Sequence, residues 1–204
     1  MKFILGTKQN MTEYFAEDGK VHPATIVSAG PIVVTQVKTK EKDGYTALQV
    51  GYGTRKEKNI TKPLKGHMGE GSFATLSEFV VTSEMASSKN KGDVIKADTF
   101  SPGDTVVVSG TSKSKGFQGV IKRHGFAGGP RTHGQKHSER APGSIGGGLR
   151  NRVPKGMRMG GRMGGDRITV RNLKVLAVDL ETNTMLISGA VPGRRGTMLE
   201  IISK

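Results

Sequence analysis

The chain has 204 residues and carries 32 Lys and Arg against 17 Asp and Glu, a formal net charge of +15. It contains no cysteine, which excludes disulfides, thiolate zinc sites and a cysteine nucleophile. No apolar run approaches the roughly 20 residues of a membrane-spanning helix, and the excess of cations favours nucleic acid over an anionic membrane surface as the partner. The N-terminal stretch lacks the apolar core of a signal peptide, so the expected location is the cytoplasm.

Short β-rich runs separated by turn residues recur along most of the chain, which is typical of an all-β protein. Strands are expected, in chain order, at residues 2–7, 24–28, 32–39, 45–52, 76–82, 105–109, 168–170, 174–179, 184–188 and 197–202. Strands this short and closely spaced predict a small β-barrel rather than an open sheet. The expected fold class is therefore mostly β with little helix.

The segments between these runs have their own signals. Asp43-Gly44 predicts a hairpin turn between two of the strands. One short helix is predicted at 61–66, with Thr61 as its N-cap and a proline in its first turn. Residues 83–92 are expected to form an exposed loop.

The positive charge belongs mainly to residues 111–171, the basic segment, which holds 14 Lys and Arg against Glu139 and Asp166 and 15 of the 30 glycines. Too little of it is apolar to offset its ordering entropy, so we expect it to be irregular and to become ordered against a polyanion. Because strand-like runs lie on both sides, it is expected to be an insertion in the barrel. The predicted organisation is a barrel domain at 1–110 with a small inserted subregion at about 54–98, the basic segment at 111–171, and strands that complete the barrel at 172–204.

Three stretches of this segment have the composition of an RNA-contacting surface. GTSKSKGFQGVIKRHGF at 110–126 places cations beside glycines, whose backbone amides can contact phosphates. GGPRTHGQKHSERAPGSIG at 128–146 has an irregular backbone that the grooves and 2′-hydroxyls of structured RNA can satisfy. RMGGRMGG at 158–165 combines arginine forks with close backbone approach. No major-groove helix or ribbon is visible and stacking aromatics are few, which favours folded RNA over DNA and over single strands.

No catalytic residue, cofactor or metal site is predicted. The chain has no GxxxxGK[ST], no GxGxxG after a strand, no GxSxG and no HExxH. His133 and His137 have the spacing of a metal-binding pair, but Gly134 lies between them and the chain has no cysteine ligands. Neither an enzymatic activity nor a small-molecule substrate is expected.

The order of motifs resembles one family over nearly the whole chain. LGTKQNMTEYF, AGPIVVTQVKTKEKDGYTALQVGYG, the two basic stretches above and RMGGRMGGDRITVRNLKV follow one another as in the bacterial large-subunit ribosomal protein L3 family. The resemblance implies a translation-protein-type β-barrel with a long internal extension that enters the large-subunit rRNA and approaches the peptidyl-transferase centre. It also implies an early role in subunit assembly, with rRNA and neighbouring ribosomal proteins as partners and the cytoplasmic ribosome as the location.

The resemblance and the charge pattern together indicate a set of rRNA-binding residues. They are the cations and histidines of the matching motifs: Lys113, Lys115, Lys122, Arg123, His124, Arg131, His133, Lys136, His137, Arg140, Arg150, Arg152, Lys155, Arg158, Arg162 and Arg167. Some bacterial members of the family carry a methylated glutamine directly after GSIG. Here Gly147 occupies that position, which excludes the modification.

Two other functions remain open on the sequence alone. A free RNA chaperone that works outside any particle would need the same charge. An enzyme that uses the glycine-rich segment to hold a nucleotide would need a phosphate-binding loop between a strand and a helix, and the sequence shows none.

Overall fold

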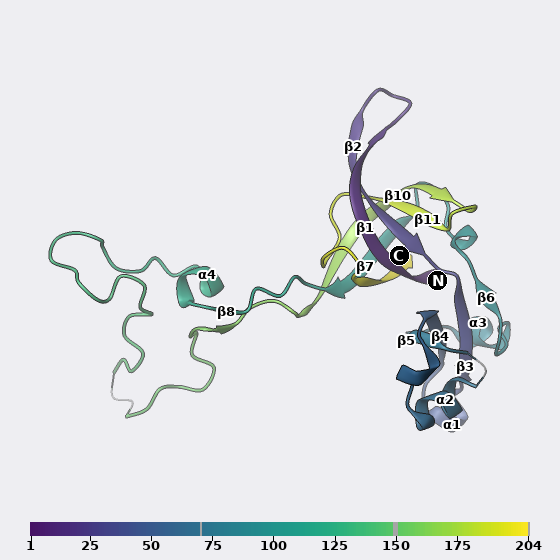
Figure 1. Cartoon of the computed structure of the whole chain (residues 1–204), viewed down its shortest axis with the longest axis horizontal. Coiled ribbons are helices and arrows are strands. Elements are labelled where there is room, and N and C mark those ends of the chain that lie inside the picture. Colours follow the sequence, from purple (N-terminus) through teal and green to yellow (C-terminus); the bar gives the residue numbers. More distant parts are fainter. Residues whose placement is uncertain (70, 149–150, 204) are drawn as a thin grey trace. The chain divides into compact units, whose positions relative to one another are not determined.

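The computed structural model describes residues 1–69, 71–148 and 151–203, and divides the chain into two compact units (Figure 1). The first unit contains residues 1–111 and 167–204, and the second unit, residues 112–166, is inserted between them. Strands dominate and helices are short, which confirms the predicted mostly β fold. In the described part of the chain, no helix is long and apolar enough to cross a membrane.

Six strands of the first unit close into a barrel, as the sequence predicted. Their order around the barrel is β1 (Phe3–Phe15), β12 (Met198–Ser203), β7 (Thr105–Thr111), β10 (Arg167–Asp179), β11 (Thr184–Ser188) and β2 (Val21–Ala29). Every neighbouring pair is antiparallel, including β1 with β2, which completes the ring. Closure leaves no free strand edge within the ring.

The barrel interior is filled by alternate residues of these strands. Met185 and Ile187 of β11, and Leu199 and Ile201 of β12, are completely buried, and the residues between them are less buried. This period of two is the reason why the runs form strands, because it places one apolar face of each strand inside the ring. Gly110 of β7 makes room for this packing, since a Cβ there would lie 2.7 Å from Leu199 Cδ2.

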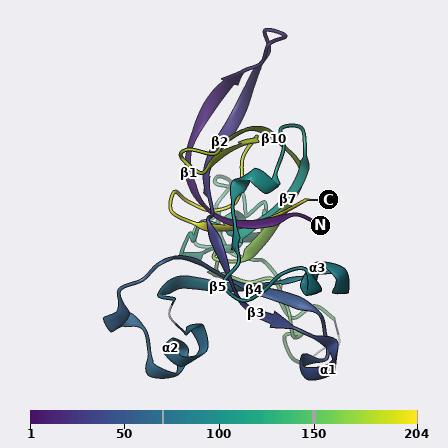
Figure 2. The same cartoon turned by 90° about the vertical axis from the view of Figure 1, so that its right-hand side faces the viewer.

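A second, four-stranded sheet packs against the barrel within the first unit (Figure 2). Its strand order is β5 (Phe73–Val80), β4 (Ala47–Thr54), β3 (Ile32–Lys38) and β6 (Val94–Ile95). The ring of Phe3 stacks on that of Phe79 with centroids 4.4 Å apart. The Tyr52 hydroxyl donates to the Ser28 carbonyl at 3.1 Å, so the two sheets share one core and a polar contact.

The helices of this unit are single turns or little more. They are α1 (Lys40–Asp43), η1 (Glu57–Asn59), α2 (Lys62–Met68), α3 (Ser83–Ser87) and η2 (Ala97–Thr99). The predicted helix at 61–66 is confirmed as α2, with Thr61 at the N-cap position, although the Thr61 side chain makes no capping hydrogen bond. The strands β3 and β4 form the predicted hairpin, but α1 lengthens its connection, and Gly44 ends that helix with a φ of 80°.

Two local predictions were wrong. Residues 83–92 are not simply an exposed loop, because α3 occupies the first half and buries Ala86 in the core. The runs 168–170 and 174–179 are one strand, β10, whose pairing with β7 shifts register between Val170 and Leu173. Such a bulge adds an unpaired residue without ending the strand, so the sequence pattern is interrupted where the strand is not.

The difference in burial between two leucines predicts a difference in what their replacement by alanine costs in stability. Leu199→Ala should lower the free energy of unfolding by about 2–5 kcal/mol, because it leaves a cavity in a closed ring. Leu180→Ala, in the connection between β10 and β11 where the side chain is 58% exposed, should change it by less than about 0.5 kcal/mol. Urea denaturation of the two variants measures the difference, and equal losses would contradict the assigned core.

Candidate nucleic-acid interface

The second unit begins and ends in a short antiparallel ladder, which we call the neck and define as residues 112–118 and 161–166. Strand β8 (Phe117–Gln118) pairs with β9 (Gly161–Arg162). Below this pairing, the Ser112 amide donates to the Asp166 carbonyl at 2.8 Å and the Lys115 amide to the Met163 carbonyl at 2.9 Å. The two ends of the unit are therefore held side by side by backbone hydrogen bonds.

The second half of the RMGGRMGG repeat forms one side of this neck. Gly164 has a φ of 75°, and a Cβ there would lie 2.1 Å from the Lys113 carbonyl oxygen. Only glycine fits such a position, because both the backbone conformation and the space exclude a side chain. This half of the repeat is thus a structural element of the neck.

A short helix, α4 (Val120–His124), follows β8 and is tied to the first half of the repeat. It ends at Gly125, which has a φ of 74°. Arg123 Nη1 and His124 Nε2 both donate to the Met159 carbonyl, at 2.8 and 3.0 Å. Two of the predicted RNA-binding side chains therefore also fix the fold of the unit, and both are half-buried.

Beyond α4, the described residues 125–148 and 151–160 contain no helix or strand. The Gly129 amide donates to the Glu139 carbonyl at 2.9 Å, and the Glu139 side chain pairs with Arg131. His133 adopts a φ of 58°, one of three non-glycine residues with positive φ among those described. Backbone of this kind lacks the hydrogen-bond ladder of a helix or sheet, so its exposed peptide groups can bind an external partner.

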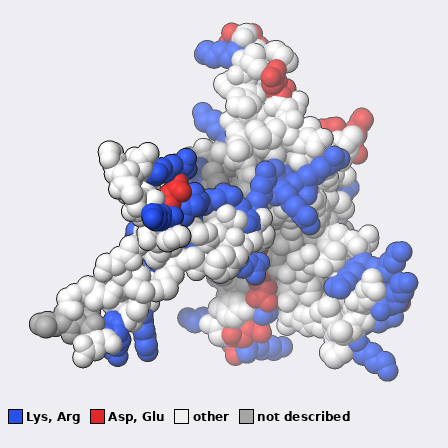
Figure 3. Space-filling view, turned by 60° about the vertical axis from the view of Figure 1, so that its left-hand side comes forward, with Lys and Arg blue, Asp and Glu red and all other residues white. Residues whose placement is uncertain are grey.

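The cations of the second unit lie on its surface with little opposing charge (Figure 3). Within the described residues of the unit, only Arg131 pairs with a carboxylate, and the two acidic residues of the unit are Glu139 and Asp166. A charged surface of this kind is suited to phosphates, because each contact releases condensed counterions.

The structure distributes the predicted residues over the second unit and one strand of the first. Exposed side chains in the neck, in α4 and in the irregular stretch belong to Lys113, Lys115, Lys122, Arg131, His133, Lys136, His137, Arg140, Arg152, Lys155, Arg158 and Arg162. Arg167 instead begins β10 in the first unit, where it pairs with Glu200 of β12. Arg150 lies outside the described residues.

A second group of cations, which was not predicted from the sequence, lies in the first unit. It comprises the exposed side chains of Arg55, Lys56, Lys58, Lys62 and Lys65, around η1 and the start of α2. Glu57 is the one acidic residue among them, and it pairs with Lys65 at 2.8 Å. A charge count over residues 1–110 hides this cluster because acidic residues elsewhere cancel it, whereas a window of 55–65 reveals it.

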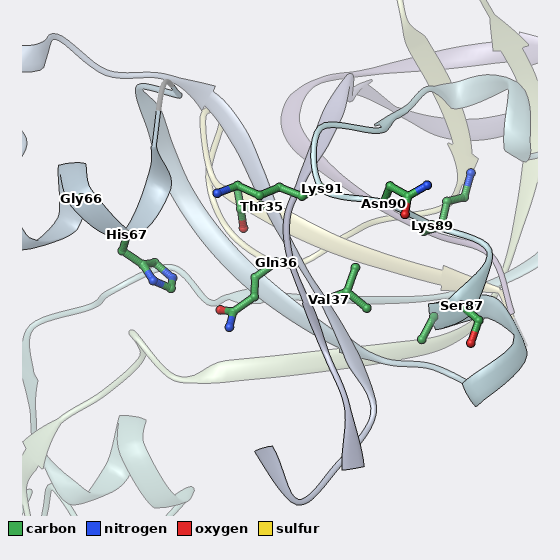
Figure 4. Close-up of a pocket in the computed structure, with 10 residues that line it drawn as sticks. Thr35, Gln36, Val37, Gly66, His67, Ser87, Lys89, Asn90 and Lys91 are labelled. Carbon is green, nitrogen blue, oxygen red and sulfur yellow. The ribbon is translucent and has the colours of Figure 1, made fainter. Parts of the chain in front are cut away.

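A polar cavity of about 640 Å³ opens beside the second sheet (Figure 4). Its wall includes Thr35 and His67, and both bond Gln49 Oε1, at 2.9 and 2.8 Å. Gln49 in turn donates to Glu78, whose pKa is lowered mainly by the hydrogen bond from Lys38. These polar groups satisfy one another, and none of the predicted RNA-binding residues lines the cavity.

Metal chemistry finds no support in the described part of the chain. It contains no group of three or more His, Asp or Glu side chains that could hold an ion. His133 and His137, the one pair with suitable spacing in the sequence, are both exposed.

Comparison with known proteins identifies relatives along the whole sequence. Residues 54–189 match the family described as Ribosomal protein L3. The chain is 49% identical to Large ribosomal subunit protein uL3 of Herpetosiphon aurantiacus over 97% of its own length and 94% of that protein. It is 50% identical to the protein of the same name from Trichormus variabilis, over 98% of the chain and 95% of the relative.

The geometry of the neck predicts different effects for two glycines with nearly the same backbone. Gly164→Ala should break the ladder, because its Cβ would meet the Lys113 carbonyl. Gly156→Ala has a similar φ of 77° but nothing within 4 Å of the added Cβ, so it controls for backbone strain alone. Amide exchange at Lys115 and Met163 should accelerate about tenfold or more in the first variant relative to the second. Equal amide exchange rates in the two variants would contradict the assigned backbone pairing of the neck.

Proposed function

The chain belongs to the ribosomal protein L3 family, and from this we propose that it is a structural constituent of the large ribosomal subunit that binds the large-subunit rRNA. The observation that carries the proposal is the second unit, which exposes a series of cations on irregular backbone and opposes them with two carboxylates. The family also supports two finer roles, which we propose for this chain. It helps to nucleate subunit assembly, and its second unit extends toward the peptidyl-transferase centre.

The physical role of the second unit is to neutralise phosphates where RNA helices come together. Residues 112–166 leave and return through the neck, so the contour of about 180 Å is folded back and its reach is at most about 90 Å. Cations along such a path lower the cost of bringing phosphates close to one another. This work requires no covalent step, and we propose no enzymatic activity, cofactor or small-molecule substrate.

The residues of the proposed interface fall into two groups. The exposed cations and histidines of the second unit contact RNA directly, as does Arg150. Arg123 and His124 hold α4 against the repeat through the Met159 carbonyl and present their remaining donors to RNA. Arg167 contributes at the base of the neck while it remains paired with Glu200.

The cluster around η1 and α2 gives the first unit its own phosphate contacts. Its five cations occupy a window of eleven residues with one carboxylate. We propose that it anchors the first unit on RNA independently of the second. Neighbouring ribosomal proteins complete the set of partners, and the cytoplasmic ribosome is the proposed location.

A deletion that keeps the neck tests the assignment. Replacing residues 127–157 with a short Gly-Ser linker removes six Lys and Arg but keeps α4, both strands of the neck and the Arg123 contact. The slope of log affinity against log salt for large-subunit rRNA should become shallower by up to about 5, since each lost phosphate contact on a duplex contributes about 0.9. Filter binding over a salt series measures both slopes.

Two controls make the result interpretable. Cooperative unfolding of the first unit should be the same in the deletion and in the full chain, because the barrel does not use the deleted residues. The full chain should prefer large-subunit rRNA over an unrelated structured RNA and should co-sediment with large subunits after a high-salt wash. An unchanged slope would show that residues 127–157 do not make the phosphate contacts. Equal affinity for all RNAs would favour a free RNA chaperone.

A further inference from the structure

The hairpin of β1 and β2 continues beyond the barrel as a free two-stranded ribbon (Figure 1). Pairing of β1 with β12 ends at Thr7, and pairing of β2 with β11 begins at Ala24. In the described structure, the strand pairs from Glu13 opposite Pro23 to Phe15 opposite Val21 lie beyond the barrel, and their last contact with it is the hydrogen bond from the Gly189 amide to the Pro23 carbonyl, at 2.7 Å. A two-stranded ribbon of this kind gains little stability in water by itself.

One face of this ribbon carries large apolar side chains that are half or more exposed. Phe15 is 71% exposed, Met11 is 51% exposed and Val21 is 49% exposed. Phe15 and Val21 are direct cross-strand partners, and Met11 lies on the same face because side chains alternate along a strand. Phe15 and Val21 lie at the projecting end and Met11 at the base of the same face, and three such side chains along one face mark an interaction surface, whereas a single exposed one would be unremarkable.

The charge around this apolar face is opposite to that of the rest of the protein. Glu13 lies between Met11 and Phe15 on the same face, and Glu17 and Asp18 follow in the turn. Lys20 is the one lysine or arginine at the tip, and it pairs with Asp18 at 2.9 Å. The tip is thus acidic in a chain with a net charge of +15, and Figure 3 shows this acidic cluster on the uppermost projection of the first unit.

This combination selects the class of partner. Phosphates are repelled by the three carboxylates, which a single lysine opposes, so RNA is disfavoured as a partner of this tip. A protein surface that has an apolar depression surrounded by Lys or Arg would bury the Phe15 ring and pair with the carboxylates.

We propose that the projecting face of the β1–β2 hairpin, with Phe15 and Val21 near the tip and Met11 at the base as apolar anchors and Glu13 and Glu17 as charged contacts, docks onto a basic neighbouring protein in the large ribosomal subunit. The inference rests on the proposed function, because it places the partner in the same particle. The contact area of a hairpin tip is small, so it acts together with the RNA contacts of the same chain, which raise the effective concentration of the two surfaces.

Photo-cross-linking in the assembled particle tests the inference. The full-length chain is made with benzoylphenylalanine in place of Phe15, or in place of Thr12, which is exposed on the opposite face of the ribbon and serves as the control. After incorporation into large subunits and a high-salt wash, irradiation at position 15 should give a protein cross-link to a Lys- and Arg-rich segment. Position 12 should give at least about fivefold less of this product.

A charge variant adds a second readout. Glu13→Lys combined with Glu17→Lys should lower the cross-link yield from position 15 at least about fivefold, whereas Lys20→Glu should not lower it. Neither change touches the barrel core, and thermal unfolding of the first unit should confirm that the fold is kept.

The outcomes separate the two proposals. Co-sedimentation with cross-links only to rRNA, or with equal protein cross-links from both faces, would overturn the docking surface and leave the ribosomal function intact. If neither the labelled chain nor the unlabelled chain co-sediments with large subunits, both the docking surface and the ribosomal function would be overturned.

Discussion

Closure of the barrel through the pairing of β7 with β10 is the constraint on which the rest of the structure depends. Thr111 at the end of β7 lies directly opposite Arg167 at the start of β10, so the two ends of the inserted unit are fixed side by side by the sheet itself. The neck continues this ladder with backbone hydrogen bonds from Ser112 to Asp166 and from Lys115 to Met163. The irregular cationic stretch therefore needs no core of its own, because its ordering begins from a boundary that the barrel has already set.

The two units divide the physical tasks of the molecule. The first buries its apolar side chains in a ring and an adjoining sheet, and its stability comes from that burial. The second unit uses few residues for internal contacts, mainly those of the neck and the hydrogen bonds of Arg123 and His124 to the Met159 carbonyl. Its remaining cations stay exposed, which is costly for folding alone and useful for binding a polyanion.

Much of the first unit could be predicted because alternation of apolar residues is a local signal. Met185 and Ile187, or Leu199 and Ile201, reveal their strands within a few residues. Which sheet a strand joins depends on residues far away in the sequence, so the separation of β3 and β4 from the barrel could not be predicted. The helix around Ala86 was missed because its burial depends on the core beneath it. At the candidate site, charge revealed the exposed cations but averaging hid the cluster at 55–65, and nothing in the sequence shows that Arg123 binds a carbonyl 36 residues away.

The position of β12 has a consequence for the order in which the protein forms during synthesis. Its residues pair with β1, with Ile202 opposite Phe3, so the first strand to be made must wait for one of the last before the ring can close. The four-stranded sheet at 32–95 has no such delay, since all its strands are close in sequence. A nascent chain therefore passes through a stage in which this sheet is complete, the cationic stretch has emerged and the barrel is still open. Nucleic acid is then available to the basic residues before the scaffold that will hold them exists.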